Sequence, residues 1–317
     1  MQGVKIYKIT SNKSLGLGAS ATTQEFGENI PGGTIGTLVG RITGTSAAAT
    51  VDGSFDNLIS NLRLTLNGTV ITDFRANFNS ATAENAGRFG YLLQSIGGKS
   101  VEKPGSLSKE YYFELPLGVT AEAGTSRLEI TMGFSAAQAA FTTSNLDLYI
   151  RYNDAVPQTT YVQPATSFTH GIGIEQVVIR RGGHPGTVAG ILVQNDTAAD
   201  ELGTQGIRIH ALGAFGLDPD LYRMLNGDLD NGVHAGVDGT STSQLQYFQQ
   251  VPGCLFIPTY QLSGGDVIAE VDSSAVTTRT YSLVITSPVN AKEADSVKQT
   301  EAVKVSTAGS ILRRAEE

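Results

Sequence analysis

The segment Asn61-Leu-Arg-Leu-Thr-Leu-Asn-Gly68 decides the fold class, because its apolar and polar residues alternate without a break. A period of two places the three leucines on one face of a β-strand and leaves the other face in water. The Asn-Gly pair at the end of the segment is typical of a tight hairpin turn. Residues 128–132 and 146–152 alternate in the same way. The first half of the chain therefore predicts sheets with one buried face.

The second half of the chain repeats this order of elements. The segment Gly206-Ile-Arg-Ile-His-Ala-Leu-Gly213 matches the opening one. An aromatic strand with a proline, Tyr112-Phe-Glu-Leu-Pro116, matches Leu255-Phe-Ile-Pro258. A closing alternating strand at 146–152 matches 281–287. The repeated order predicts two consecutive β units, and it is stronger evidence than the few identical residues.

Only two stretches have helical spacing, and each lies in the middle of one half. Residues 81–96 carry apolar side chains three and four positions apart, and Gly97-Gly98 ends that pattern. Residues 217–226 offer Asp218 as an N-cap and Pro219 for the first turn. We therefore expect short helices within the connections between strands.

The chain divides into four segments on these patterns. A polar stretch with a proline, residues 153–160, has no periodicity and is typical of a linker. The expected segments are an N-terminal arm at 1–14, a first β unit at 15–154, a second β unit at 155–291 and a C-terminal tail at 292–317. The arm is basic, because Lys5, Lys8 and Lys13 precede the first acidic residue, Glu25.

The composition excludes several classes of protein. Charged residues make up 16% of the 317 residues, and the net charge is −8, which argues against a broad nucleic-acid footprint. Cys254 is the only cysteine, so no internal disulfide can form, and we expect a buried thiol. No signal peptide and no apolar run long enough for a bilayer is found. We therefore expect a soluble chain that is made in the cytoplasm.

Catalytic and zinc-binding motifs are absent from the sequence. There is no G-x-S-x-G, H-E-x-x-H or P-loop pattern. The histidines lie outside metal-ligand spacing of one another; they are His170, His184, His210 and His234. Glu114 and Glu129 are the candidates for an acid/base pair, but both lie on alternating strands, where solvated faces are usual. We expect no enzymatic activity.

One acidic loop has the residue types of a calcium site. Asp228, Asp230 and Asp238 lie in a Gly-rich stretch after the second helix, and Ca²⁺ takes six to eight oxygen ligands. The spacing departs from an EF-hand, since Asn231 stands where the turn glycine belongs. The alternative is an acidic surface loop that binds no metal.

Two consecutive units of roughly 140 residues each match the length of an eight-stranded jelly roll. In this layout the chain resembles the double jelly-roll major capsid proteins of tailless, icosahedral phages that contain a membrane, the corticovirus and tectivirus type. The features that carry the resemblance are the strand motifs 62–68 and 207–213, the helices 81–96 and 218–226, and the pairs Phe113/Pro116 and Phe256/Pro258.

This resemblance implies an all-β fold of two consecutive eight-stranded jelly-roll β-sandwiches, with short helices in the inter-strand connections. It implies a homotrimer, which forms a pseudo-hexagonal capsomer that tiles an icosahedral virion shell. Neighbouring capsomers and penton or minor capsid proteins would then be partners, with no sequence-specific contact to nucleic acid. The termini would face the inside, where Lys5, Lys8 and Lys13 would lie on an internal membrane, or else form a solvated end.

Two other classes of function are weighed against a shell protein. The first is a carbohydrate-binding or host-attachment β-sandwich, although the chain has no Trp for stacking on sugars. The second is an enzyme on a β-sandwich, which needs a convergent acid/base pair in a cleft.

Overall fold

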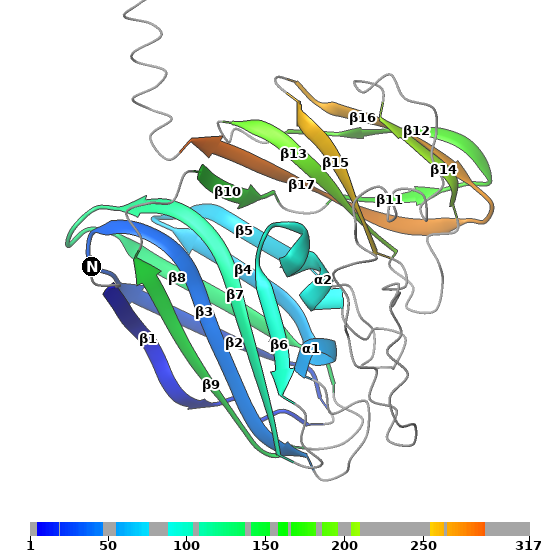
Figure 1. Ribbon diagram of the computed structural model, residues 1–317. Coiled ribbons are helices and arrows are strands. Elements are labelled where there is room, and N and C mark those ends of the chain that lie inside the picture. Colours follow the sequence, from blue (N-terminus) through cyan, green and yellow to red (C-terminus); the bar gives the residue numbers. More distant parts are fainter. Residues whose placement is uncertain are drawn as a thin grey trace, which may run out of the picture.

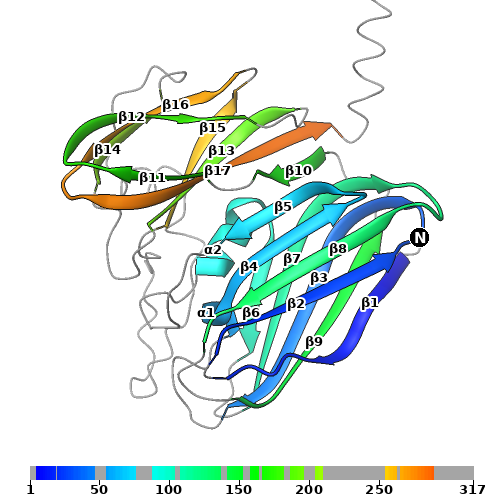
Figure 2. The same cartoon turned by 180° about the vertical axis from the view of Figure 1, so that it is seen from behind.

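The structure is a computed structural model of the 317-residue chain. It describes residues 5–18, 20–46, 55–75, 88–103, 108–136, 141–152, 158–163, 166–181, 186–195, 204–209, 254–262 and 265–288. Within these ranges the chain forms two β-sandwich units that lie next to each other (Figures 1 and 2). Strands dominate both units, which confirms the all-β prediction.

The first unit consists of two facing sheets, a five-stranded sheet and four strands of a longer sheet. The five-stranded sheet has the order β1 (Lys5–Ser14), β9 (Phe141–Tyr152), β3 (Gly33–Ser46), β7 (Ser108–Ala121) and β6 (Lys99–Lys103). The facing strands have the order β5 (Thr69–Arg75), β4 (Ile59–Leu66), β8 (Arg127–Phe134) and β2 (Thr22–Asn29).

The second unit contains the remaining strands of the long sheet, and a three-stranded sheet faces these strands. Its strands in the long sheet are β15 (Cys254–Leu262), β13 (Thr187–Asn195), β17 (Thr277–Pro288), β10 (Gln158–Val162) and β11 (Thr166–His170). The three-stranded sheet has the order β12 (Gly173–Ile179), β16 (Val267–Ser273) and β14 (Thr204–Ile209).

The two units share one strand order, which confirms the duplication predicted from the sequence. The order β1-β9-β3-β7 in the first unit corresponds to β10-β17-β13-β15 in the second. The facing order β2-β8-β4 corresponds to β12-β16-β14. Successive strands cross between the facing sheets, as a jelly roll requires. The matched sequence segments fall on equivalent strands, with 62–66 in β4 and 207–209 in β14.

The N-terminal segment is built into the first sheet, where the sequence had suggested an arm. Residues 5–14 form β1, which pairs antiparallel with β9 along its length. The buried side chain of Ile9 anchors β1 to the core. The strand β6 is additional, because it joins the edge of the five-stranded sheet beyond β7. The first unit therefore contains nine described strands, one more than the expected eight.

The expected linker also contributes to a sheet. The boundary expected after residue 154 falls between β9 and β10, but β10 already begins at Gln158. Its residues Thr159 to Val162 are β-branched or aromatic, which favours a strand. They pair with β17, and Val162 also pairs with Thr72 of β5. The expected tail at 292–317 lies outside the described residues.

Helix α2 (Arg88–Ser95) confirms part of the first predicted helix, and its upstream part, 81–87, lies outside the described residues. The helix ends as the glycine pair predicts. Gly97 has a φ of 80°, and its N–H donates to the Gln94 carbonyl at 2.9 Å, while the Gly98 N–H donates to the Leu93 carbonyl at 2.8 Å. A short helix that the sequence analysis missed, α1 (Phe55–Leu58), precedes β4. The second predicted helix, 217–226, lies outside the described ranges.

The hydrophobic core of the first unit extends into the second. It contains Val162, Leu192 and Val284, which come from β10, β13 and β17. The neighbouring residues Ile191 and Val193 belong instead to the core of the second unit. Strand β13 is therefore buried on both faces, and it joins the two sandwiches.

Candidate interaction surfaces

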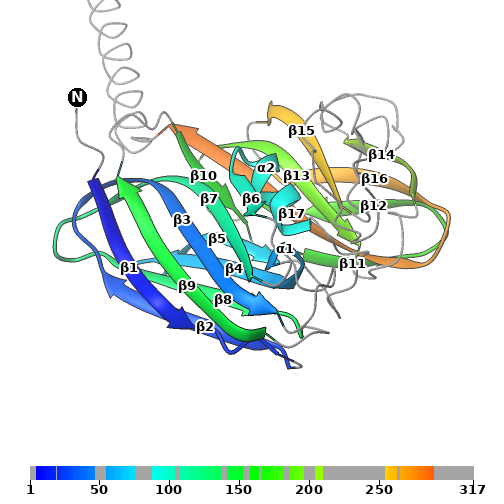
Figure 3. The same cartoon turned by 60° about the horizontal axis from the view of Figure 1, so that its bottom comes forward.

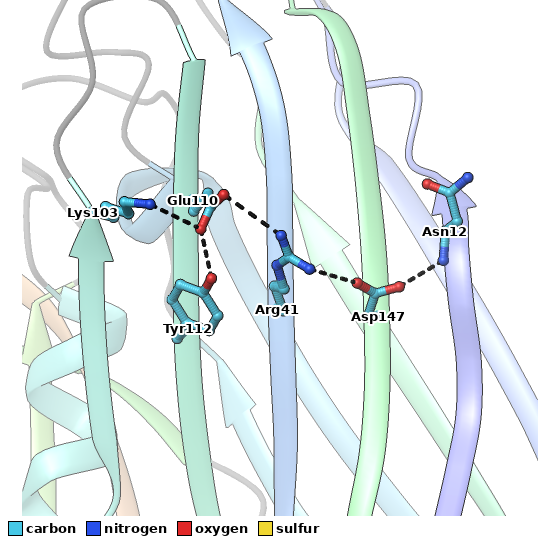
Figure 4. A network of polar contacts seen from close by, with 6 residues as sticks. All are labelled: Asn12, Arg41, Lys103, Glu110, Tyr112 and Asp147. Atoms are coloured by element: carbon cyan, nitrogen blue, oxygen red, sulfur yellow. Dashed lines mark hydrogen bonds and ion pairs between the residues drawn. The ribbon is translucent and has the colours of Figure 1, made fainter.

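The outer face of the five-stranded sheet carries an ordered row of charges. Along β9, Leu146, Leu148, Ile150 and Tyr152 point into the core, so Asp147 and Arg151, which alternate with them, face outward. The same alternation in β3 and β7 sends Arg41 outward beside Asp147 on one flank and the side chains of β7 on the other. Figure 4 shows that the polar contacts cross all five strands of this sheet.

The charges in this row alternate in sign. Lys103 Nζ lies 3.8 Å from Glu110 Oε2, and Arg41 Nη2 lies 3.5 Å from Glu110 Oε1. Arg41 Nη1 lies 3.8 Å from Asp147 Oδ2, and Asp147 Oδ1 accepts a hydrogen bond from the backbone N–H of Asn12 at 2.7 Å. Each charge thus has an opposite neighbour on the next strand. Exposed pairs of this kind each contribute little to stability, because solvent screens them.

Glu110 is the centre of the row. The Tyr112 hydroxyl donates a hydrogen bond of 2.5 Å to Glu110 Oε2. This bond, together with the positive charges of Lys103 and Arg41, lowers the pKa of Glu110 below its ordinary value. The same bond raises the pKa of Tyr112, whose ring also lies under the Arg41 guanidinium. Glu110 therefore stays ionised, and the face presents balanced charges to whatever lies against it.

The second unit ends in an apolar tip, which we define as Ile172, Ile174 and Val276. Their exposed fractions are 74%, 68% and 66%, the largest among the exposed large hydrophobic residues described. The strand register places them together. His170 pairs with Thr277 and Gly173 pairs with Ser273, so the β11–β12 corner lies beside the β16–β17 turn.

A buried polar cluster supports the tip from below. His170 Nε2 lies 2.9 Å from the Tyr281 hydroxyl, and His170 Nδ1 lies 3.3 Å from Glu175 Oε2. The fully buried Arg279 donates to Ser273 Oγ at 2.7 Å. Burial raises the pKa of Tyr281 to about 12. Burial, assisted by the Arg279 charge, lowers the pKa of His170, so this histidine is neutral at pH 7.

The structure separates the three lysines expected on a membrane. Lys5, Lys8 and Lys13 are exposed and lie along β1. Lys5 lies over the ring of Tyr152 at 4.9 Å, near one end of the strand. Lys13 pairs with Leu146, six residues away from Tyr152 along β9, so it lies about 20 Å further along at a rise of about 3.3 Å per residue. They therefore form a basic strand edge, and their contact with a membrane stays a prediction.

The predicted calcium ligands Asp228, Asp230 and Asp238 lie outside the described residues, so this site also stays a prediction. Within the described ranges no group of three or more His, Cys, Asp or Glu residues is arranged to hold a metal ion. The other three histidines, His184, His210 and His234, fall outside these ranges. Cys254 is buried and forms no disulfide.

The candidate acid/base residues are not brought together. Glu114 lies in the five-stranded sheet, 3.7 Å from Arg151 Nη1. Glu129 lies in the facing sheet, 3.0 Å from Arg127 Nε. Each carboxylate therefore has its own cationic neighbour, and the two pairs lie on separate sheets.

The sequence analysis missed the residues that define the two surfaces. It assigned no role to the isoleucines at positions 6, 172 and 174, or to Arg41 and Glu110. The stretch Gly171-Ile-Gly173 contained a signal, because glycines on both sides of a large apolar residue favour a turn, where burial is uncommon. The sequence contained no such signal for the charge row, because that row depends on contacts between strands that lie far apart in the sequence.

No helix in the described ranges has the length and hydropathy needed to span a bilayer. No family model matches the sequence. No curated protein matches it either.

Several solved structures share the architecture. The major capsid protein P2 from bacteriophage PM2 is 10% identical with a TM-score of 0.51, over 90% of this chain and 98% of that chain. The STIV MCP is 10% identical with a TM-score of 0.57, over 92% and 98%. A chain of the PBCV-1 virus capsid is 9% identical with a TM-score of 0.51, over 90% and 93%. At these identities the likeness shows the fold, and it extends over both units.

Proposed function

We propose that this protein is a major capsid protein, which assembles with copies of itself into the shell of an icosahedral virion. The observation that carries the proposal is the repeated strand order of the two units, β1-β9-β3-β7 and β10-β17-β13-β15. The similar structures that share this architecture over nine-tenths of the chain are capsid proteins by name. Fold alone does not fix function, so surface chemistry has to agree with it.

The surfaces support a role in assembly. The charge row on the five-stranded sheet is balanced, so a neighbour can cover it without leaving a charge unpaired. Exposed apolar side chains are present at separate places in the two units. Glu114 and Glu129 lie on different sheets, which favours a structural protein over an enzyme.

The finer details follow from the resemblance drawn from the sequence. The proposed assembly unit is a homotrimer with a pseudo-hexagonal outline, in contact with neighbouring capsomers and with penton or minor capsid proteins. The protein is made in the host cytoplasm and resides in the virion shell. Calcium at Asp228, Asp230 and Asp238 is part of this proposal, and a chelator should then lower the melting temperature of the assembled protein.

The mass of the purified protein in solution tests the proposal. Light scattering after size exclusion should give three times the 33.3 kDa of the chain, and electron micrographs should show three-fold particles. A monomer at micromolar concentration would contradict assembly. Binding of that monomer to a glycan array would instead favour the carbohydrate-binding alternative.

A further inference from the structure

One sheet of the second unit is covered on both of its faces. The inner face of β10-β17-β13-β15 packs on the core of the second unit, and the outer face packs on the first unit. Val162 and Val284 belong to this outer face, and both are buried in the core of the first unit. Phe256 packs against the same core, and its backbone N–H donates to the Tyr91 hydroxyl of α2. The contact between the units therefore uses the outer face of this sheet.

The corresponding outer face of the five-stranded sheet carries exposed apolar side chains. Ile6 pairs with the outward-facing Arg151, and Val101 pairs with Tyr112, so all three apolar or aromatic side chains share this face. Ile6 is 63% exposed and Val101 is 61% exposed. In Figures 1 and 3 no labelled helix or strand lies in front of β9 and β3. A face that is covered in the second unit is thus open in the first.

The strand registers match the two faces residue by residue. In the first unit Ile6 pairs with Arg151, and this row of paired residues ends at the proline of β7. In the second unit Val162 pairs with Val284, and the row ends at the proline of β15. The same two prolines are matched in the sequence analysis. Ile6 therefore holds the position of Val162, which is only 1% exposed and lies in the core of the first unit.

The polar residues at two other matched positions neutralise each other. Arg151 stands where the second unit has Val284, and Glu114 stands two residues before the proline, where the second unit has Phe256. Arg151 Nη1 lies 3.7 Å from Glu114 Oε1, and Arg151 Nη2 donates to the Thr37 hydroxyl at 3.0 Å. A partner can therefore cover these residues without leaving a charge unpaired.

We propose that the second unit of a neighbouring copy covers this face at β1, in the way that the first unit covers β10-β17-β13-β15 within the chain. Ile6 then takes the buried place of Val162. This proposal rests on the proposed self-assembly and names the faces that meet. The contact joins two different faces, so it is head-to-tail and can close into a ring. Three chains then place their first and second units side by side in alternation.

The contact within the chain also predicts which strand of the neighbour meets β1. Within the chain, β7 of the first unit meets β10 of the second, where the Thr159 hydroxyl donates to the Gly118 carbonyl. In the shared strand order β15 corresponds to β7, and β1 corresponds to β10. The matching contact between copies therefore brings β15 of one copy against β1 of the next.

A second copy fits this face better than a lipid surface does. The carboxylates of Glu110, Glu114 and Asp147 stand on it, and anionic headgroups would repel them. The face also matches, strand for strand, one that already packs on a unit of this fold.

Substitution of Ile6 tests the contact in the full chain. Ile6→Glu should give single chains at concentrations at which the wild type stays assembled, because the new charge would be buried in the contact. Ile172→Glu is the matched control and should stay assembled, because Ile172 is also exposed but lies at the end of the second unit away from β10 (Figures 1 and 2). Light scattering after size exclusion gives the mass of each variant.

The outcomes separate the two proposals. If the wild-type chain is a monomer, the proposed function fails. If the wild type assembles and Ile6→Glu assembles equally well, only the proposed contact is wrong. Loss of assembly in Ile172→Glu with none in Ile6→Glu would also contradict the contact, since it would place the interface at the tip.

The ion pair gives an independent measurement. Glu114→Gln should weaken self-association by about tenfold or more, because it leaves Arg151 unpaired beneath a partner. Glu129→Gln is the matched control, since it breaks the pair with Arg127 on the facing sheet and should leave association unchanged. Equal association of the two variants would count against coverage of this face.

Photochemical cross-linking identifies the strand that lies against β1. A photoreactive benzoyl-phenylalanine in place of Ile6 should link to a peptide that contains β15. Since β1 and β15 lie far apart within one chain in all three views (Figures 1, 2 and 3), this product must join two copies. A link to the first unit of the neighbour would overturn the proposal. So would a link to lipid when anionic vesicles are present, which would assign the face to a membrane.

Discussion

Two glycines hold equivalent places in the two units. Gly40 in β3 lies under the ring of Phe113, its cross-strand partner in β7. Gly190 in β13 lies under the ring of Phe256 on the neighbouring strand β15. A Cβ atom at either position would overlap ring carbons. An aromatic ring that covers a strand glycine is thus a shared packing device of both jelly rolls.

Gly40→Ala should lower the free energy of unfolding by about 1–3 kcal/mol, because the added methyl group must displace a buried ring. Urea denaturation measures the effect. Gly18→Ala is the control, since no atom lies within 4 Å of its Cβ position. In a Phe113→Leu background, Gly40→Ala should lower the free energy of unfolding by much less. An equal cost of Gly40→Ala in both backgrounds would contradict the overlap.

His170 should make the stability of the protein depend on pH. Its pKa is lowered from 6.5, mainly by burial, so below pH 6.5 the unfolded chain takes up a proton that the folded chain does not. The free energy of unfolding should therefore fall as the pH drops through 6.5, and this fall should stop below the lowered pKa. Above pH 6.5 the contribution is fully present.

Denaturation of the wild type and of His170→Gln at about pH 7.5 and about pH 5.5 measures this dependence. The variant should lose less stability between the two pH values than the wild type does. Equal losses would show that His170 takes no part in the pH dependence.

At the scale of single elements, the sequence predicted what local chemistry determines. The β4–β5 hairpin follows from its alternating leucines and from Asn67 and Gly68, whose φ values of 50° and 79° suit a tight turn. β1 was missed because most of its side chains are polar, and β10 because its short β-branched run follows a segment without periodicity; pairing with β9 and β17 stabilises the two strands. Such pairing is not visible in a single segment.

A hydrogen bond connects helix α2 to the second unit. The backbone N–H of Phe256, on the edge strand β15, donates to the Tyr91 hydroxyl at 2.9 Å. Tyr91→Phe should cost about 1 kcal/mol of stability and should speed hydrogen exchange at the Phe256 amide, because that N–H loses its acceptor.

Tyr7→Phe is the control for this prediction, since the Tyr7 hydroxyl makes only an exposed contact of 3.5 Å with the Asn29 carbonyl. Its effect on stability should be small. An unchanged exchange rate at Phe256 in Tyr91→Phe would mean that the hydrogen bond does not join the units in solution.

At the scale of the whole molecule, β13 provides two neighbouring residues that report on different cores. Leu192 packs in the core shared with the first unit, and Ile191 packs in the core of the second. Replacing either by Ala should cost about 2–5 kcal/mol. Leu192→Ala alone should also speed hydrogen exchange in α2 of the first unit. Identical exchange patterns in the two variants would contradict a shared core.

The duplication was predictable from the sequence, because the order of elements recurs even where few residues are identical. The continuity of the long sheet through both units was not, since it depends on β10 meeting β5 across the molecule. The charge row and the apolar tip have the same origin. Both join residues that lie far apart in the chain, so strand register has to be known first.

The placement of β10 has a mechanical consequence. This strand pairs with β17 on one side and meets β5 on the other, and the Thr159 hydroxyl donates a 2.5 Å hydrogen bond to the Gly118 carbonyl of β7. β10 therefore ties the two sandwiches together, and these contacts oppose a change in the angle between them. In a shell built from such chains, we therefore expect curvature to arise where copies meet and not within a subunit.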